Sequence, residues 1–443
     1  MNRTKRSPVY LMALTIFIDF MGFGVVLPLL PFWAERLGAG PVGVGLLLTV
    51  YALAQFIFTP VLGALSDRYG RRPIILASLL IEALSLALSA VAGSLAILVV
   101  ARFIGGLGAS NIGSAQAVVA DVTPVEGRAR GMGLIGAAIG LGFVVGPALG
   151  GLVAPLGPAV PFWVAMSVAL ANALLVLRFL PETRYARTES PPDLFAPRAV
   201  RRSAHRTTRK VPTLPSTAPA STVIRGMGAA FAGWRRVLRN PVVVRLVVIN
   251  LLFTVAFTAM EAVFPLFTQH SFGWKAIQNG YIFTYAGIVI VLMQGGLVGQ
   301  LVKRWGERSL LITGLVMLAA GLALLSWSTN LALLLVALGV VSISDGAVTP
   351  VVSALLSFAS PPTTQGETLG LAQGVAGLGR VIGPLAAGSA FAIGGPGAPF
   401  FLGSALGVLA ALIALPALSS KREVSPTHST PEVQTVFTTQ DRS

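Results

Sequence analysis

The chain lacks cysteine and contains only three histidines among its 443 residues. The absence of cysteine excludes disulfides, zinc–thiolate sites and cysteine nucleophiles. The histidines are scattered along the sequence, so we expect no metal centre and no cofactor. No pairing of a nucleophile with a general base is visible either, and we therefore do not expect an enzyme.

Charged residues are also scarce. They make up 11% of the chain, whereas soluble proteins carry about 25%, and the mean hydropathy is +0.80. A soluble chain of this length would form two or three domains. This composition indicates an integral membrane protein instead, and we expect it to work in the lipid bilayer as a monomer.

Twelve apolar runs of about 20 residues follow one another, each long enough for a helix to cross a bilayer. The first run lacks the small-residue cleavage site of a signal peptide, so we interpret it as a span. The sequence thus predicts an all-α integral membrane protein with twelve transmembrane helices in two six-helix halves. The runs cover residues 9–30, 44–65, 74–92, 95–117, 131–153, 160–180, 243–268, 278–301, 309–328, 331–353, 367–392 and 399–418.

The two halves share the same landmarks. In the loop Gly63–Pro73 a glycine is followed by a basic residue, an aromatic residue, a second glycine and an arginine. The same order of residue types returns about 236 residues later in Gly299–Arg308. The stretch Gly140–Pro147 likewise returns as Gly377–Pro384. Such internal repeats are a common plan of transporters. We expect four parts: a first half at 1–180, a basic, proline-rich cytoplasmic linker at 181–240, a second half at 241–420 and a disordered tail at 421–443.

The net charge of +16 is unevenly distributed along the chain. Residues 181–240 contain twelve Lys/Arg against three Asp/Glu and so hold nine of these charges. Most other basic residues fall in alternate loops between the apolar runs, and loops of this kind stay in the cytoplasm. The pattern argues against a nucleic-acid partner. It predicts a multi-pass protein of the plasma membrane, or of the inner membrane in a Gram-negative cell, with both termini in the cytoplasm.

Several motifs resemble the major facilitator superfamily, and the likeness extends over the whole chain. Gly63–Pro73 matches its signature between helices 2 and 3, Arg102–Gly106 resembles its fourth-helix motif, and Gly140–Gly151 resembles the fifth-helix motif of the antiporter branch. Within that branch the chain is most similar to the tetracycline/proton antiporters, for example at Asp19–Gly22 and Leu266–Thr268. The resemblance implies alternating access and proton-coupled efflux of an amphipathic, tetracycline-like drug, hence antibiotic or multidrug resistance.

Ionisable residues inside the apolar runs are candidates for proton coupling. A charge at the centre of a bilayer costs about 3 kcal/mol or more, so it usually has a function. The candidates for proton coupling are Asp19, Glu82, Arg102 and Glu261.

Two departures from the tetracycline antiporters limit this comparison. In those proteins the acid of the third helix falls about one turn later, near Ser85, and the ninth helix also holds an acid. Here no acid occurs between Leu310 and Trp327. Asp345 and Arg380 are further intramembrane charges, which could face a cavity or simply pair with each other.

Amides and aromatic residues in or near the spans are candidates for binding an amphipathic substrate, because they combine apolar surface with a few polar groups. The substrate-binding candidates are Phe23, Gln55, Asn111, Gln116, Gln269, Gln294 and Gln373.

Charged residues of the first short loop are candidates for a cytoplasmic gate. Asp67 can accept hydrogen bonds from a helix start or pair with an arginine. In an outward-open state we expect it to bind the start of the eleventh span near Glu367, with Arg71, Arg72 and Arg130 as further gate residues.

Glycines four residues apart form a flat face on the fifth span. Gly142, Gly146 and Gly150, with Pro147 among them, would let another helix approach closely. The face could serve packing alone or could be a sliding contact between the halves, as the antiporter motif implies.

Two other functions compete with drug export. An exporter or symporter of a sugar or another metabolite would share the fold, although the fifth-helix motif argues against a symporter. A non-transporting membrane receptor is a further alternative, against which the intramembrane carboxylates argue.

Overall fold

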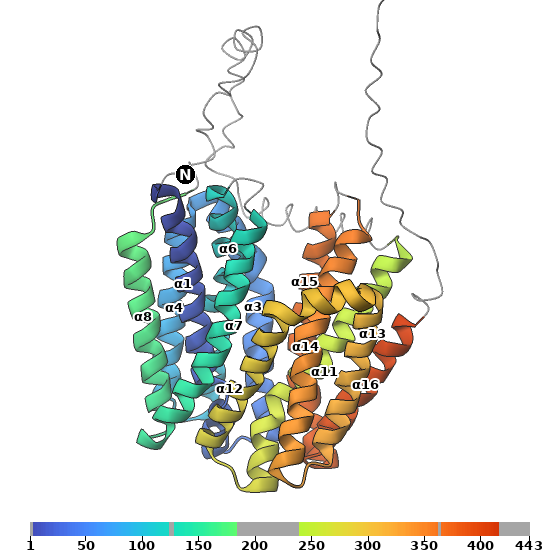
Figure 1. The fold of residues 1–443 in the computed structure, drawn as a ribbon. Helices are drawn as coiled ribbons and strands as arrows, with labels where there is room; N and C mark the ends of the chain where they lie inside the picture. Colours follow the sequence, from blue (N-terminus) through green and yellow to red (C-terminus); the bar gives the residue numbers. More distant parts are fainter. Residues whose placement is uncertain (1–2, 124–127, 184–238, 362–364, 416–443) are drawn as a thin grey trace, which may run out of the picture.

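A computed structural model describes residues 3–123, 128–183, 239–361 and 365–415 of the chain. Within these ranges every regular element is a helix (Figure 1). Most of the predicted linker and all of the predicted tail lie outside the described residues.

The first half contains the six predicted spans. The fourth span is interrupted by a 3₁₀ turn at Ala109–Asn111, and a short helix that the sequence did not predict follows the first span. The helices are α1 (Arg3–Val26), α2 (Leu30–Arg36), α3 (Pro41–Tyr69), α4 (Arg71–Ala90), α5 (Leu95–Gly108), α6 (Ile112–Val122), α7 (Arg128–Val153) and α8 (Val160–Phe179).

The second half repeats this plan. Its helices are α11 (Pro241–Phe272), α12 (Ala276–Leu292), α13 (Val298–Ser326), α14 (Leu331–Phe358), α15 (Gln365–Gly394) and α16 (Ala398–Ala414), with a π-helical turn at Met293–Leu297. The stretch Ala276–Ser326 covers 51 residues, and Gly306, whose backbone is not helical, divides it into two helical parts. At 1.5 Å per residue each part is long enough to cross a bilayer, so the stretch accounts for two spans. The prediction of twelve spans is confirmed.

Two glycines turn the chain at equivalent places in the two halves. Gly70 has φ 109° and ψ 155° between α3 and α4, and Gly306 has φ 76° and ψ 159° inside α13. Residues with a Cβ rarely adopt this conformation. The repeat seen in the sequence is therefore a repeat of backbone geometry as well.

Polar side chains fix the starts of several spans. Ser94 accepts a hydrogen bond from the backbone N–H of Ile97, and Asn330 accepts one from that of Leu333. Asn240 does the same ahead of α11 and is followed by a proline. These caps satisfy donors that the first helical turn would otherwise leave unpaired.

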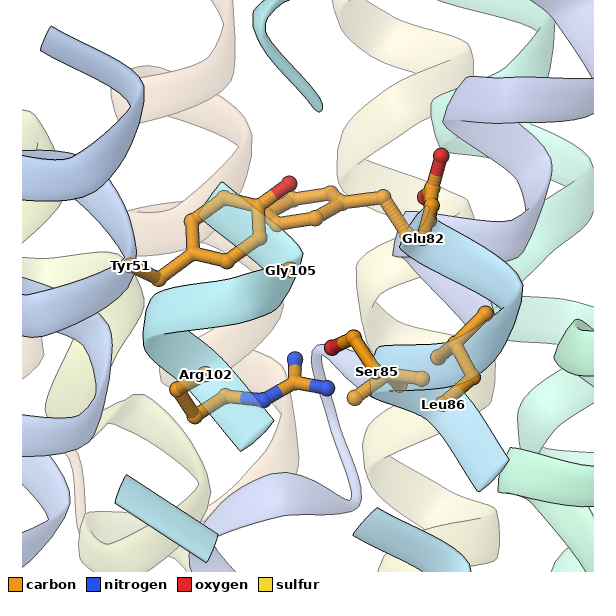
Figure 2. A pocket seen from close by; sticks show the side chains of 8 residues that line it. Tyr51, Glu82, Ser85, Leu86, Arg102 and Gly105 are labelled. Atoms are coloured by element: carbon orange, nitrogen blue, oxygen red, sulfur yellow. The ribbon is translucent and has the colours of Figure 1, made fainter. Parts of the chain in front are cut away.

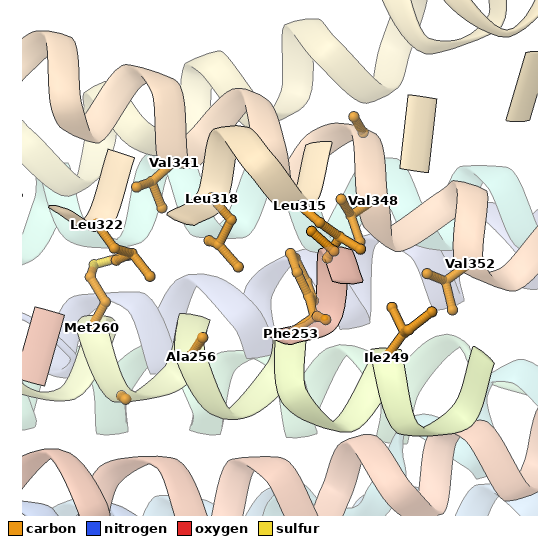
Figure 3. Packing of buried hydrophobic residues seen from close by; sticks show 14 of the residues in the cluster. Ile249, Phe253, Ala256, Met260, Leu315, Leu318, Leu322, Val341, Val348 and Val352 are labelled. Atoms are coloured by element: carbon orange, nitrogen blue, oxygen red, sulfur yellow. The ribbon is translucent and has the colours of Figure 1, made fainter. Parts of the chain in front are cut away.

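The core of the second half lies between α11 and the helix pair α13–α14 (Figure 3). One face of α11 contributes Ile249, Phe253, Ala256 and Met260, which recur at helical spacing. They face Leu315, Leu318 and Leu322 of α13 and Val341, Val348 and Val352 of α14. In lipid, close van der Waals packing of this kind holds helices together.

The two halves meet along α3 against α15 and along α7 against α12. We call the end of the bundle where α1 begins and α16 ends the terminus side, and the other end the far side (Figure 1). On the far side the backbones nearly touch: a Cβ on Gly280 of α12 would lie 2.6 Å from the carbonyl oxygen of Pro147, and one on Gly151 would lie 3.1 Å from Gly280 Cα.

On the terminus side the same four interface regions are open. A Cβ on Gly63 of α3, Gly136 of α7, Gly296 in the π-helical turn or Gly370 of α15 would meet no atom within 4 Å. The halves are thus closed against each other on the far side and separated on the terminus side.

Candidate functional site

Two carboxyl groups lie together inside the first half. Asp19 of α1 is 9% exposed and Glu82 of α4 is 7% exposed. Asp19 lies beside Glu82 and beside Asn111 of the 3₁₀ turn, and the side-chain nitrogen and oxygen of Asn111 are buried without a hydrogen-bond partner among the described residues. Gly108 allows this arrangement, because a Cβ there would lie 2.8 Å from the backbone nitrogen of Glu82.

The carboxyl pair has more acceptors than donors. Ionised carboxylates only accept hydrogen bonds, so Asp19 and Glu82 can bond to each other only when one of them is protonated. Without that proton Asp19 Oδ1 and Glu82 Oε2 are buried and have no partner among the described residues. Unpaired buried oxygens are costly, and a single proton shared by the pair removes the cost.

Arg102 of α5 lies near this pair without forming an ion pair with any described residue. Its Nη2 donates a hydrogen bond of 2.9 Å to Ser89 Oγ, and its guanidinium lies 5.9 Å from the ring centre of Tyr51. Ser85 and Ser89 are in turn held by backbone carbonyls. Arg102 is thus held by the hydroxyl group of Ser89, while its charge interacts with Glu82 across a short gap.

The gap between Arg102 and Glu82 is a small cavity (Figure 2). Its volume of about 10 Å³ admits about one water molecule, so it is too small for a drug. It is lined by Phe23, Val26, Tyr51, Glu82, Ser85, Leu86, Arg102 and Gly105.

The second half holds another set of charges. Arg380 of α15 interacts electrostatically with Glu261 of α11, with Asp345 of α14 and with Tyr51 of the first half. Asp345 accepts a hydrogen bond of 3.1 Å from Thr349. Within the described residues Asp345 and Arg380 form no ion pair, so the structure does not show them as a simple structural pair.

Three of the substrate-binding candidates lie near the carboxyl pair. Asn111 lies beside Asp19, Gln55 donates a hydrogen bond to the carbonyl of Ala109, and Phe23 packs against Tyr51. The other candidates lie elsewhere.

Gln116, Gln294 and Gln373 are exposed on α6, in the π-helical turn and on α15. Gln269 lines a separate cavity on the far side, between the halves, of about 110 Å³. That cavity is also lined by Glu35, Pro41, Leu266, His270 and Phe391.

The gate candidates are held within the first half in this state. Arg71 pairs with Asp67 at 2.5 Å and with Asp121 of α6 at 3.2 Å, and the Asp67 side chain is 67% exposed. Arg72 donates a hydrogen bond to the carbonyl of Leu177. Arg130 lies in the first turn of α7, where side chains fall outside the described part of the structure.

Sequence reasoning missed the partners Asp121 and Glu182. The backbone N–H groups of Arg71 and Arg72 donate to the Glu182 carboxylate at 2.9 Å and 3.2 Å. Glu182 therefore occupies the start of α4, a position that Asp67 could also have filled, and it ties the end of α8 to the loop. Asp121 and Glu182 are acids placed just where a span ends, which is the signal that could have identified them.

The glycine face of α7 packs within the first half. A Cβ on Gly142 would lie 2.6 Å from Phe20 Cβ, and one on Gly146 would lie 2.6 Å from Met21 O, both on α1. Gly150 approaches the carbonyl of Val25 even more closely. Contact with the other half is made instead by the neighbouring face of α7, 100° around the helix, where Pro147 O and Gly151 meet α12.

Comparison with known proteins agrees with this architecture. The family model of the Major Facilitator Superfamily matches residues 12–311 and 295–439. A class E tetracycline resistance protein of Escherichia coli is 32% identical over 87% of each chain. The class C protein of Escherichia coli is 30% identical over 91% of this chain and 94% of its own.

Solved structures give the same result. The crystal structure of the human organic anion transporter MFSD10 (TETRAN) superposes with a TM-score of 0.64 at 27% identity, over 93% of this chain and all of that one. The nucleoside transporter NupG, at 13% identity, superposes with a TM-score of 0.71 over 95% of this chain and all of its own, and shows the fold alone. The chain therefore belongs to the major facilitator superfamily of membrane transporters.

Proposed function

We propose that the chain is a proton-coupled antiporter that exports an amphipathic, tetracycline-like drug by alternating access. The similarity to tetracycline resistance proteins over most of both chains supports this substrate class. The basic loops and linker support an orientation with the terminus side in the cytoplasm. The protein would then reside in the plasma membrane and use protons as its only coupling ion.

The observation that carries the proposal is the buried carboxyl pair. Asp19 and Glu82 have unpartnered oxygens that one proton can satisfy. A drug or a conformational change that alters their surroundings therefore changes whether the proton is held. Arg102 remains charged throughout, and its charge favours the ionised form of Glu82 once the proton leaves. Glu261 would act in the same way beside Arg380 in the second half.

The arrangement of the halves supplies the second requirement of an exporter. The halves are closed on the far side and separated on the terminus side, so this state would load a drug from the cytoplasm. Rocking of the halves about the α3–α15 and α7–α12 contacts would close the terminus side and open the far side. In that second state Asp67, which is exposed here, would meet the start of α15 near Glu367.

The test is proton-driven uptake of tetracycline into inside-out membrane vesicles. Asp19→Asn should abolish this uptake while the protein stays folded, because the amide cannot take up and release the proton. The matched control is Glu307→Gln, which removes the acid that follows the turn at Gly306, between the predicted apolar runs 278–301 and 309–328. Undiminished uptake by Asp19→Asn would remove Asp19 from the mechanism, and the absence of uptake by the wild type would contradict the proposed substrate.

A further inference from the structure

Arg380 faces the space between the two halves. On one side of it along α15, Val381 accepts a hydrogen bond from α3 and Pro384 contacts α3. On its other side, Gly379 and Gly383 pack against α11. At 100° per residue Arg380 lies between these two rows, so its side chain points into the seam between α3 of the first half and α11 of the second.

The Arg380 guanidinium is available for a ligand. Its side chain is exposed, and within the described residues it forms no ion pair or hydrogen bond. It is nevertheless inside the span, in electrostatic reach of Glu261 and Asp345. A cation without a partner at this depth is costly, and an arginine fork is suited to hold a carboxylate or another planar anion.

A cluster of aromatic side chains in the first half borders this seam. Phe143 lies 5.4 Å from Phe20 and 5.9 Å from Phe23, and Phe23 lies 5.6 Å from Tyr51, measured between ring centres. Phe23 and Phe143 also pack against the core of the second half. Tyr51 links this cluster to Arg380, because the two side chains are in electrostatic reach of each other.

The internal repeat accounts for the difference between the two halves at this seam. Alignment of Gly140–Pro147 with Gly377–Pro384 places Arg380 at the position of Phe143. The first copy thus provides an aromatic side chain and the second copy a cation. Apolar rings on one side and a few placed polar groups on the other are typical of a site for an amphipathic ligand.

We propose that Arg380 binds the anionic group of an aromatic substrate whose rings lie on Phe20, Phe23, Tyr51 and Phe143. The inference rests on the proposed function in one respect: the substrate passes through the space between the halves. Beyond the proposed function it names the substrate class, which is an aromatic organic anion or a zwitterion with one ionised acid. Glu261 and Asp345 compete with that anion for Arg380, so their protonation favours its binding.

The test measures binding of two fluorescent aromatic probes of opposite charge, fluorescein and ethidium, to the purified chain by fluorescence anisotropy. Arg380→Gln should weaken fluorescein binding by roughly tenfold to a hundredfold, the size expected for lost charge-assisted hydrogen bonds, and should change ethidium binding little. Arg380→Lys should recover part of the loss. Arg178→Gln, which removes a cation at the exposed end of α8, is the matched control and should change neither.

A second variant separates binding from a structural role. Glu261→Gln removes a competitor of the anion and should tighten fluorescein binding, whereas loss of a merely structural contact would weaken it. Gluconate, an anion without rings, should displace fluorescein poorly.

The inference is overturned if fluorescein does not bind the wild type, if Arg380→Gln leaves its binding unchanged or weakens both probes equally, or if Glu261→Gln weakens it. Binding that depends on Arg380 without any proton-driven transport would instead contradict the proposed function and leave the anion site standing.

Discussion

Gly280→Ala should shift the protein away from the state described here. The new Cβ would lie 2.6 Å from Pro147 O and 2.7 Å from Gly151 Cα, both backbone atoms of α7 that cannot rotate away. Overpacking of this kind costs about 1–3 kcal/mol. The cost applies only while α7 and α12 are closed on the far side, so it should change the ratio of the two states by roughly 5- to 150-fold.

The matched control is Gly136→Ala, on α7 itself. Its Cβ would meet nothing within 4 Å in this state, so the substitution should not shift the equilibrium toward the state that is open on the far side. Alanine also favours the helix over glycine by about 1 kcal/mol in both variants. That gain is the same in both states and cancels.

The assay uses a single cysteine, because the chain has none of its own. Thr49→Cys places it at a residue that is 8% exposed and buried between α3 and α15. Its reaction rate with N-ethylmaleimide is proportional to the small population that is open on the far side. Gly280→Ala should raise this rate about 5- to 150-fold until the population saturates. An equal rate in the two glycine variants would refute the view that far-side contact defines this state.

Three further predictions follow from the gate, from Arg102 and from the linker. Asp67→Asn should shift the population roughly five- to a hundredfold toward the state described here, because the proposed gate contact of about 1–3 kcal/mol forms only in the other state, whereas the pair of Asp67 with Arg71 seen here is exposed and contributes little. Lys303→Asn should do much less, and equal labelling of a terminus-side cysteine in both variants would contradict the gate contact. Ser89→Ala takes away the hydroxyl acceptor of Arg102 Nη2 and should destabilise the fold by about 1–3 kcal/mol, which would be measured as a lower Tm in detergent. Ser167→Ala, on the exposed face of α8, is the control and should leave the Tm unchanged. An unchanged Tm in Ser89→Ala would mean that Arg102 finds another partner. Deletion of about ten residues within 200–219 should leave export in vesicles nearly intact, since that segment is too polar to form a core, and complete loss in well-expressed protein would show a specific role.

Hydropathy and the repeat were sufficient for the fold. Twelve apolar runs gave twelve spans, and the recurring glycines gave the equivalent turns at Gly70 and Gly306. The short helix Leu30–Arg36 was missed because seven residues are too few for a periodic signal, and the π-helical turn at Met293–Leu297 was missed because it leaves the apolar run unbroken.

The site was only partly predictable. The cost of burying a charge, together with the resemblance to the antiporters, singled out Asp19, Glu82 and Arg102, since charges are rare in apolar runs. It could not say that Arg102 is held by Ser89 instead of a carboxylate, or that Gln269 lies in a far-side cavity. Those facts depend on how the helices are rotated about their axes, which the sequence of one helix does not contain.

Drug-driven movement of protons tests the central claim most directly. The purified chain would be reconstituted into liposomes that enclose a fluorescent pH indicator, and tetracycline would be added outside, with protein-free liposomes as the blank. An antiporter exchanges entering drug for leaving protons, so the lumen should become alkaline with the wild type and stay unchanged with Asp19→Asn. Acidification of the lumen would indicate a symporter, and the absence of any change with the wild type would contradict proton-coupled export of this drug.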